Sequence, residues 1–460
     1  MSISYNALSG ALAAQAAINT VSQNVANIQT KGYTRQGVLL QSIASDPGVN
    51  SPGNGVQVGA LLRFSDSYKS QQMWRANSEL GQRSQIQPYL TQLEKVMADK
   101  TSSISYGVDN FFKALNAAAV DPTSTPLRQQ VITMADSMSQ QINSIYNLTA
   151  TQRVSVDQQR TTMLPSLNQS LASIAALNKQ IIQVGSAGTS TSGLVDQREQ
   201  LIDAVSAQVA VEVLNNPDGS ISVSLKTGQP LVVTDMAAKL SFDTVGGTQT
   251  LNLTFAGTKY KLDDTKVGGQ LGGLGDFLEN TLKPLQGSIA GIAEQMSTMV
   301  NDQLNAGFTP PLVPGKDLFV FNPTSATGLL GIDPAFTAAD LAFSSDGTPG
   351  DSGNLQLLID IKSKPITNLP SLGVGSSVLL NDADTQVVGK LAVDSQQNQA
   401  LLKTATTIRQ QSEDDWKSTS AVNRDEEAIN LIEYQNMYQA NMKVISVANN
   451  LFDATLQMFN

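Results

Sequence analysis

Two clusters of carboxylates are the side chains of this sequence whose types and spacing come closest to catalytic chemistry. Glu413-Asp414-Asp415 and Asp425-Glu426-Glu427 each place three acids within one helical turn, and paired carboxylates can hydrolyse glycosides. The same clusters fit a solvated helix face and an acidic first turn, which the helix dipole favours. Because nothing in the sequence selects one pair, we expect no catalytic residue.

Two further motifs resemble ligand-binding loops. The stretch from Gly268 to Gly275 is rich in glycine, but it lacks the Gly-Lys-Ser/Thr of a phosphate loop and the spacing of a dinucleotide fingerprint. We expect a hinge that re-enters a helix there. Asn381-Asp382-Ala383-Asp384 resembles the start of a calcium loop, but Val387 and Val393 stand where an EF-hand needs Gly and Glu. We therefore expect no bound metal and no cofactor.

The composition excludes several classes of function. The 460 residues include no His and no Cys, which removes the commonest general base, the thiolate nucleophile, disulfides and the usual zinc ligands. With 29 basic and 39 acidic residues the net charge is −10. A nucleic-acid-binding chain needs a cationic footprint, so we expect no nucleic-acid partner. Only 15% of the residues are charged, and 41 Gln and 31 Asn make the chain polar but mostly neutral.

The first thirty residues carry no charged side chain. They lack the basic start of a secretory signal, and polar residues interrupt them too often for a membrane span, so we expect neither a cleaved signal peptide nor membrane insertion. Apolar residues at alternating steps of three and four, beginning with Ala11 and Ala14, predict an amphipathic helix over residues 5–28. The large residues that we assign to its apolar face for assembly are Leu8, Leu12, Ile18, Val21, Val25 and Ile28.

The C-terminal segment repeats this rhythm. Its predicted assembly residues are Leu431, Tyr438, Met442, Ile445, Phe452 and Leu456. Both stripes must be covered, either by the globular body of their own chain or by each other and by neighbouring copies. Polar seam residues such as Gln435 and Asn449 favour the second interpretation, because they fix register at some cost in stability. We expect loosely ordered ends in the free chain and a terminal coiled coil in an assembly.

The residues between the two ends predict a mainly α fold with an inserted β-rich domain. Helical periodicity dominates, and we expect Pro165 to kink or interrupt a long helix over 125–184. Alternation with period two behind the Asn215–Gly219 turn predicts short strands. The expected domains are terminal coiled-coil and extended segments at 1–64 and 412–460, a discontinuous elongated helical bundle at 65–207, 269–307 and 351–411, a small outer β domain at 208–268, and a short irregular or β insertion at 308–350.

The N-terminal motifs resemble one known family. The runs Ser9 to Gln15 and Asn24 to Gln36 are similar to the N-terminal signature of bacterial flagellar axial proteins, which comprise rod, hook and hook-associated proteins. The family commonly has Pro before the Gly-Tyr pair, whereas this chain has Lys31 before Gly32-Tyr33. The turn that this pair predicts is compatible with either residue.

Motifs farther along narrow the resemblance to the hook-associated proteins of the hook–filament junction. They are Asp196 to Ile202, Asp218-Gly219-Ser220 and Asp425 to Asn441. The resemblance implies a structural protein that leaves the cell unfolded through the flagellar type III channel. It implies a ring of identical subunits between hook and filament, with the hook protein, a second hook–filament junction protein and an export chaperone at the C-terminal helix as partners. The expected location is the extracellular flagellum.

Three alternatives stay open. The chain could be another flagellar axial protein, such as a hook or distal rod protein. It could be a surface adhesin whose β insert contacts a ligand, although Phe242, Phe255 and Tyr260 alternate as core residues and offer little binding chemistry. Finally, it could carry a peptidase insert, but the zinc version needs two His, and the sequence has none.

Overall fold

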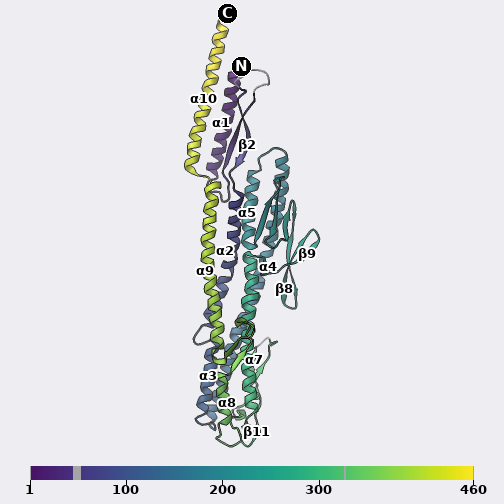
Figure 1. The fold of residues 1–460 in the computed structure, drawn as a ribbon, viewed down its shortest axis with the longest axis vertical. Helices are drawn as coiled ribbons and strands as arrows, with labels where there is room; N and C mark the ends of the chain where they lie inside the picture. The colour runs from purple at the N-terminus through teal and green to yellow at the C-terminus, as the bar shows by residue number, and fades with distance from the viewer. Residues whose placement is uncertain (1, 45–52, 326–327, 459–460) are drawn as a thin grey trace.

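The computed structural model describes residues 2–44, 53–325 and 328–458, so parts of the predicted segments 1–64, 308–350 and 412–460 lie outside the described residues. The described chain is a long rod, and Figure 1 shows both chain ends at the same end of it. The chain is mainly helical with inserted β strands, which confirms the predicted fold class.

The α-helices and one π-helix form the rod. They are α1 Ser2–Ala26, α2 Ser67–Met97, α3 Ile104–Ala118, α4 Thr125–Ser186, α5 Ser192–Gln208, α6 Gly269–Asp276, the π-helix η1 Phe277–Leu282, α7 Lys283–Asn305, α8 Gly353–Asp360, α9 Leu380–Ser420 and α10 Arg424–Gln457. Of the two effects expected of Pro165, the interruption is wrong, because α4 continues through it, and the kink stays a prediction. Pro165 removes one ladder hydrogen bond, but the buried Leu164, Leu167 and Leu171 hold both flanking turns on the core.

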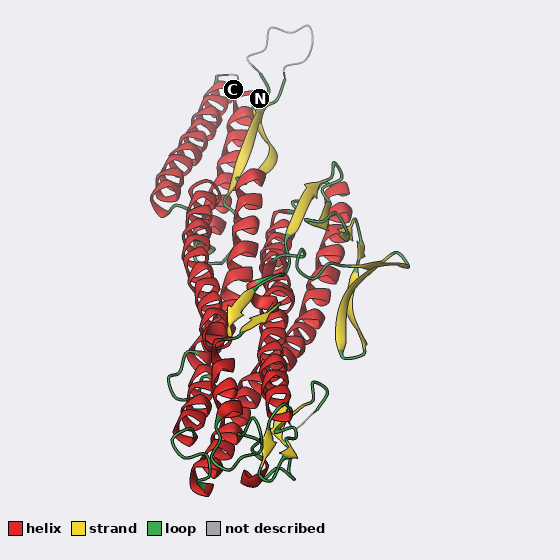
Figure 2. Cartoon of the chain, turned by 60° about the horizontal axis from the view of Figure 1, so that its bottom comes forward, coloured by secondary structure: helices red, strands yellow, loops and turns green. Residues whose placement is uncertain are grey.

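The strands form small antiparallel sheets beside the helices (Figure 2). In chain order they are β1 Gln36–Ser42, β2 Val56–Arg63, β3 Val211–Asn215, β4 Ile221–Leu225, β5 Pro230–Val233, β6 Met236–Ala237, β7 Lys239–Val245, β8 Thr248–Phe255, β9 Thr258–Lys261, β10 Phe308–Thr309, β11 Val313–Pro314, β12 Phe319–Phe321, β13 Leu330–Ile332, β14 Pro365–Thr367 and β15 Ser377–Leu379. Strands β3-β4-β5-β6 make one sheet and β7-β8-β9 another, and the remaining strands pair two by two.

The chain leaves the terminal end along α2 and returns along α9, and these two helices pack against each other. The helix α9 continues through residue 412, where the sequence places the start of the terminal segment, and ends at Ser420. A short turn follows, and the Asn423 side chain caps α10 by accepting a hydrogen bond from the backbone N–H of Asp425 at 3.0 Å. The chain therefore changes direction at residues 421–423.

The glycine-rich stretch forms the helix α6 rather than the expected hinge. Its glycines let α6 lie directly on neighbouring backbone: a Cβ on Gly273 would sit 2.6 Å from the carbonyl oxygen of Gln82, and one on Gly275 would sit 2.7 Å from that of Asp264. The sequence alone suggested that these glycines form a flexible link. In the structure they are needed because the backbone of α6 packs closely against its neighbours.

Two hydrophobic cores follow one another along the rod. The distal core, away from the chain ends, is built from α2, α3, α4, α7, α8 and the start of α9 and contains Phe111, Phe112 and Phe343. The proximal core, nearer the chain ends, is built from α2, α4, α5, α6 and strands β3–β8 and contains Trp74 and Leu251. Each core combines segments that lie far apart in the sequence.

Amide side chains fix several strands to the helices. In each case one Asn or Gln donates its NH₂ to a backbone carbonyl and accepts the N–H of that same residue, as a neighbouring strand would. The pairs are Asn24 with Gln36, Asn143 with Leu330, Asn168 with Leu240, Asn178 with Ile221, Gln295 with Thr367 and Asn301 with Phe319. These bonds satisfy strand edges that would otherwise lack partners.

We expect limited proteolysis to leave a stable core from about residue 65 to about residue 415, because exposed, weakly packed ends are cut first. Residues from both halves of the chain, such as Ile86 and Leu391, share the distal core, so the core should resist as one unit. Mass spectrometry of the fragments measures this. A cut that yields two stable halves that do not associate would contradict the shared core.

Candidate assembly site

The two chain ends form one paired unit, made of α1, the β1–β2 hairpin and α10, which we call the terminal unit. Helices α1 and α10 lie side by side (Figure 1). Small side chains allow the close approach: a Cβ on Gly10 would lie 2.6 Å from the Asn441 Oδ1. The helix α1 buries Ala7, Ala11 and Ala14, which are spaced by four and three residues as a helical seam requires.

The predicted assembly residues divide into three groups by burial. Val21 is buried. Ile18, Ile28, Leu431, Tyr438 and Ile445 are partly buried, and Leu8, Leu12, Val25, Met442, Phe452 and Leu456 are exposed. Their part in assembly stays a prediction.

The sequence placed Ala11 and Ala14 in the seam of α1, but it missed the rest of the buried line, which is formed by Ala7, Ala13 and Ala17. A search for large apolar residues selects Leu8, Leu12 and Val25, which the fold leaves exposed. At the last turn the buried position is Asn24, one residue before Val25. The signal that could have identified this line is the repeat of alanine and glycine at helical spacing.

A hairpin of β1 and β2 covers another side of α1. The backbone N–H of Val56 donates to the Ser9 hydroxyl at 3.1 Å, and the Asn6 amide donates to the Gly53 carbonyl at 3.2 Å. The hairpin therefore docks by polar contacts and keeps large apolar side chains exposed. These are Leu39, Leu40, Val58, Leu61 and Leu62.

Asn24 is the centre of a polar contact that joins the two ends of the chain. Its Nδ2 donates to the Gln36 carbonyl at 2.8 Å and to the Glu427 carboxylate at 3.1 Å. Its Oδ1 accepts from the Gln36 N–H at 3.0 Å and from the Tyr33 hydroxyl at 2.9 Å. One amide thus ties α1, the chain after it and α10 together.

Arg35 neutralises the buried Glu427. The side chain of Glu427 is 1% exposed, and one of its oxygens lies 3.0 Å from the Arg35 Nε. Arg35 also pairs with Glu426 at 2.5 Å and stacks over the Phe64 ring at 5.0 Å. Its backbone N–H donates to the Ser420 carbonyl at 2.8 Å. The acidic run that begins α10 is therefore a docking element.

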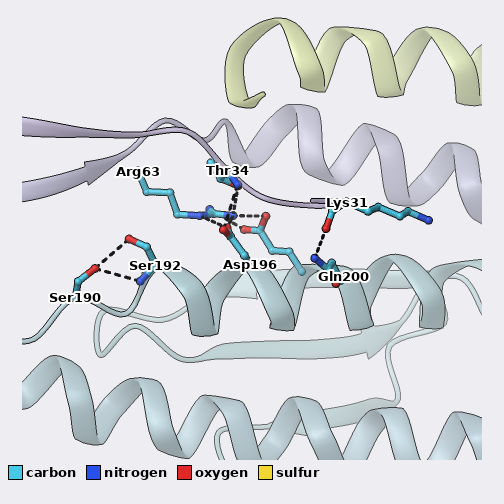
Figure 3. Close-up of polar contacts among 8 residues, drawn as sticks. Lys31, Thr34, Arg63, Ser190, Ser192, Asp196 and Gln200 are labelled. Carbon is cyan, nitrogen blue, oxygen red and sulfur yellow. Dashed lines mark hydrogen bonds and ion pairs between the residues drawn. The ribbon is translucent and has the colours of Figure 1, made fainter. Parts of the chain in front are cut away.

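A second charged cluster fixes the hairpin to the helical body (Figure 3). The Arg63 guanidinium donates to Asp196 at 2.8 Å and to both oxygens of Glu199 at 3.0 and 2.7 Å. It also donates to the Thr34 hydroxyl at 2.9 Å, and Asp196 accepts the Thr34 N–H at 3.1 Å. Despite its burial, the hydrogen bonds and charges of Glu199 and Asp196 raise the pKa of Arg63 above its ordinary value, so Arg63 keeps its positive charge between the two carboxylates.

The helix α5 supplies further contacts from the same motif. Gln200 donates to the Lys31 carbonyl, as Figure 3 shows. Arg198 points instead toward the strands β3–β9, which we call the β module: it donates to the carbonyl of Gly219 between β3 and β4 at 2.9 Å and to Asn178 of α4 at 2.8 Å. Burial lowers the pKa of Arg198 to about 10. The run from Asp196 to Ile202, quoted above for its family resemblance, thus joins the terminal unit, the body and the β module.

We call this junction of terminal unit and body the neck. The return helix α9 adds two contacts to it: Arg409 pairs with Asp203 at 3.2 Å, and Lys69 donates to the Thr419 hydroxyl at 2.5 Å. The second of these contacts joins residues that are 350 positions apart in the sequence.

Beyond the neck, the terminal unit exposes many large apolar side chains. They include Ile3, Tyr5, Leu8, Leu12 and Val25 on α1 and Ile429, Ile432, Met442, Val444, Val447, Leu451, Phe452, Leu456 and Met458 on or directly after α10. A monomeric soluble protein rarely exposes an apolar surface of this extent, whereas interaction sites do. Among the helices of the described ranges, none has a stretch long and apolar enough to cross a bilayer. The described residues also hold no cluster of three acids placed to bind a metal ion.

A family profile described as the flagellar hook-associated protein FlgK helical domain matches residues 90–319, half of the chain. The chain belongs to this family. A second profile, the C-terminal part of the flagellar basal body rod FlgEFG proteins, matches residues 418–458, which include all of α10. The family predicted from the motifs is therefore confirmed.

Individual relatives agree with the family match. Flagellar hook-associated protein 1 of Salmonella typhimurium is 26% identical over 553 residues, covering 98% of this chain and 99% of the relative. The Bacillus subtilis protein of the same name is 25% identical over 490 residues, covering 96% and 95%. The solved flagellar hook junction protein FlgK of Burkholderia pseudomallei superposes with a TM-score of 0.51 at 27% identity. That superposition covers 55% of this chain and spans about half, 47%, of the solved chain.

Glu427→Gln tests whether the buried ion pair holds α10 to α1. The amide keeps an oxygen for Asn24 but loses the charge that faces Arg35. The hydrogen bond from Asn24 stays but loses its charge assistance, a difference of about 1 kcal/mol, so amide exchange in both terminal helices should accelerate by about fivefold or more. The matched control is Glu212→Gln, which breaks the exposed pair with Arg75 and should change little. Equal rates of amide exchange in the two variants would contradict the conclusion that Glu427 holds α10 to α1.

Tyr33 gives the terminal unit a dependence on alkaline pH. Burial first, and then the charges of Asp196 and Glu427, raise its pKa to about 12 from 10.0. The folded protein therefore favours the neutral phenol, so this stabilisation is complete below pH 10 and is lost as the pH rises to about 12. Thermal unfolding across this range should show a steeper loss in the wild-type protein than in Tyr33→Phe, which cannot ionise. If the melting temperature falls with pH equally in both proteins, the ionisation of Tyr33 does not contribute to this loss of stability.

Proposed function

We propose that this chain is a structural component of the bacterial flagellum and that its copies form the junction ring between hook and filament. Membership of the hook-associated family supports this role, as do relatives of the same name that match nearly the whole chain. The observation that carries the assembly argument is the apolar surface of the paired terminal helices, because a single chain leaves it uncovered. Neighbouring copies, the hook protein and a second junction protein are the partners that would cover it.

The alternative that the chain is a rod or hook protein has one observation in its favour. The rod-type profile matches residues 418–458. It covers little beyond α10, however, whereas the helical-domain profile covers half of the chain. We therefore propose that α10 is an assembly helix common to axial proteins and that the body is specific to the junction.

We further propose that the domains follow the sequence division, with terminal segments for assembly, a helical bundle as the spacer and the β module as an outer lobe. Export through the type III channel fits a chain without Cys, because no disulfide can form before secretion. A chaperone would bind the exposed apolar face of α10, which also needs cover before assembly. The lack of His and Cys supports a structural rather than a catalytic role.

Val25→Asp and Ile445→Asp test the assembly role of the terminal helices. Val25 is 44% exposed and Ile445 is partly buried, so a carboxylate at either position would have to enter an apolar contact in the ring, at a high desolvation cost. We expect the purified variants to keep the circular dichroism of the body, while electron microscopy shows cells without attached filaments.

The matched control is Val120→Asp, which adds the same charge at an 87% exposed position of the body. Filaments should form normally in that strain. Normal filaments on either terminal variant would show that these helices are not the assembly surface.

A further inference from the structure

One carboxylate lies buried at the distal core without a cation beside it. Asp384 belongs to the first turns of α9 and is 4% exposed. The residues around it on the two helices that meet here are apolar members of the distal core: Ala383 and Val387 on α9, and Ile104 and Val108 on α3. A buried charge is costly unless it is paired, so the state of this carboxyl matters for the contact between α3 and α9.

One oxygen of Asp384 binds the first turn of α3. Its Oδ2 accepts a hydrogen bond from the backbone N–H of Ser105 at 2.9 Å and another from the Ser105 hydroxyl at 3.0 Å. Ser105 is the second residue of α3, which lies at the end of the rod opposite the chain ends (Figure 1). The contact therefore joins the outgoing half of the chain to the returning half, across 279 positions of sequence.

Two buried acceptor atoms beside this contact receive no hydrogen bond from the described residues. They are the second oxygen of Asp384, Oδ1, and the Oδ1 of Asn381. Positions 381 and 384 are three residues apart on α9, so their side chains are neighbours on one face of the helix. Buried acceptors normally have a donor. One proton on the Asp384 Oδ1 satisfies both atoms, because the acid O–H can then donate to Asn381.

The charged side chains near the start of α9 do not compensate Asp384. Lys362 pairs with Asp109 at 2.8 Å, and Lys390 pairs with Asp394. Burial raises the pKa of the Asp384 carboxyl above its ordinary value of 3.8, and the opposing effect comes from the hydrogen bonds of Ser105. In the part of the chain that the structure describes, Asp384 forms no ion pair with the other titratable residues of the surrounding segments, which are Glu94, Lys95, Tyr106, Lys113, Lys283, Glu294, Asp302, Asp360, Lys364 and Asp382.

We propose that Asp384 makes the contact between α3 and α9 sensitive to pH, holding the first turn of α3 firmly while its carboxyl is protonated and loosely once the proton is lost. The protonated acid accepts from Ser105 with Oδ2 and donates from Oδ1 to Asn381. The ionised form leaves an unpaired charge at an apolar core and two acceptors side by side. This property belongs to the free chain and is independent of the ring partners proposed above.

The raised pKa fixes the sign of the effect. The folded chain holds the Asp384 proton more tightly than a chain in which α3 has opened. This stabilisation is therefore complete below pH 3.8 and is lost as the pH rises through the pKa of the folded protein. Between these two values, openings that expose Asp384 become up to about tenfold more frequent for each pH unit, and above them the frequency levels off.

Hydrogen exchange of the α3 amides in the full chain measures these openings, once each rate is corrected for the pH dependence of the chemical exchange step. We expect the opening of the first turn of α3 to increase between about pH 4 and about pH 7. Asp384→Asn places an amide there, which accepts with one atom and donates with the other, as the protonated acid does. This variant should lose the pH dependence and protect α3 better than the parent chain at about pH 7. The matched control is Asp109→Asn, which changes the exposed pair with Lys362 on the same helix and should keep the pH dependence.

Asn381→Ala tests the direction of the second hydrogen bond. It removes the acceptor of the acid proton, so the loosening of α3 should move to lower pH. A move to higher pH would mean that Asn381 donates to a charged carboxylate, and would overturn the proposal. So would a parent chain in which α3 opens equally at all pH values, or an Asp384→Asn variant that is folded by circular dichroism but keeps the pH dependence of the parent.

Discussion

The pairing of α1 with α10 is the constraint on which the rest of the architecture depends. Two segments separated by nearly the whole chain must meet along one seam, so the chain between them must travel out and return. The helix α2 carries the chain away from the paired ends, and α9, packed against α2, brings it back. The distal core, the proximal core and the β module are then all built on a path that starts and finishes at the same end of the rod (Figure 1).

The neck gives this pairing a defined geometry. A seam of alanines and glycine brings α1 and α10 close but supplies little apolar area for its length. Asn24, Arg35 and Arg63 supply the specificity that the seam lacks, because each bonds partners from more than one segment. Buried charges are costly unless fully paired, and the paired set at the neck therefore selects one arrangement of the terminal unit on the body.

The sequence predicted the fold class, the family and the two terminal helices. Hydrophobic periodicity and the order of motifs can both be read along the chain without knowing which residues meet in space. It did not reveal that Asn24 sits on the buried face where Val25 was expected, since that choice depends on the backbone of Gln36 and on Glu427. The acidic run at the start of α10 looked like a solvated first turn, and its buried member Glu427 became identifiable only once Arg35 was placed beside it. The glycines of α6 looked flexible for the same reason, because their close neighbours Gln82 and Asp264 are distant in sequence.

The central claim is that the chain ends remain paired with each other in the assembled flagellum. Gly10 and Asn441 touch in this structure, and the chain has no other Cys, so Gly10→Cys with Asn441→Cys provides a single crosslinking pair. Flagella isolated from a strain that carries both substitutions are oxidised, and the disulfide is sought by mass spectrometry. The account predicts a high yield of the 10–441 disulfide in flagella that retain their filaments. A disulfide that forms in the purified chain but is absent from filament-bearing flagella would contradict it.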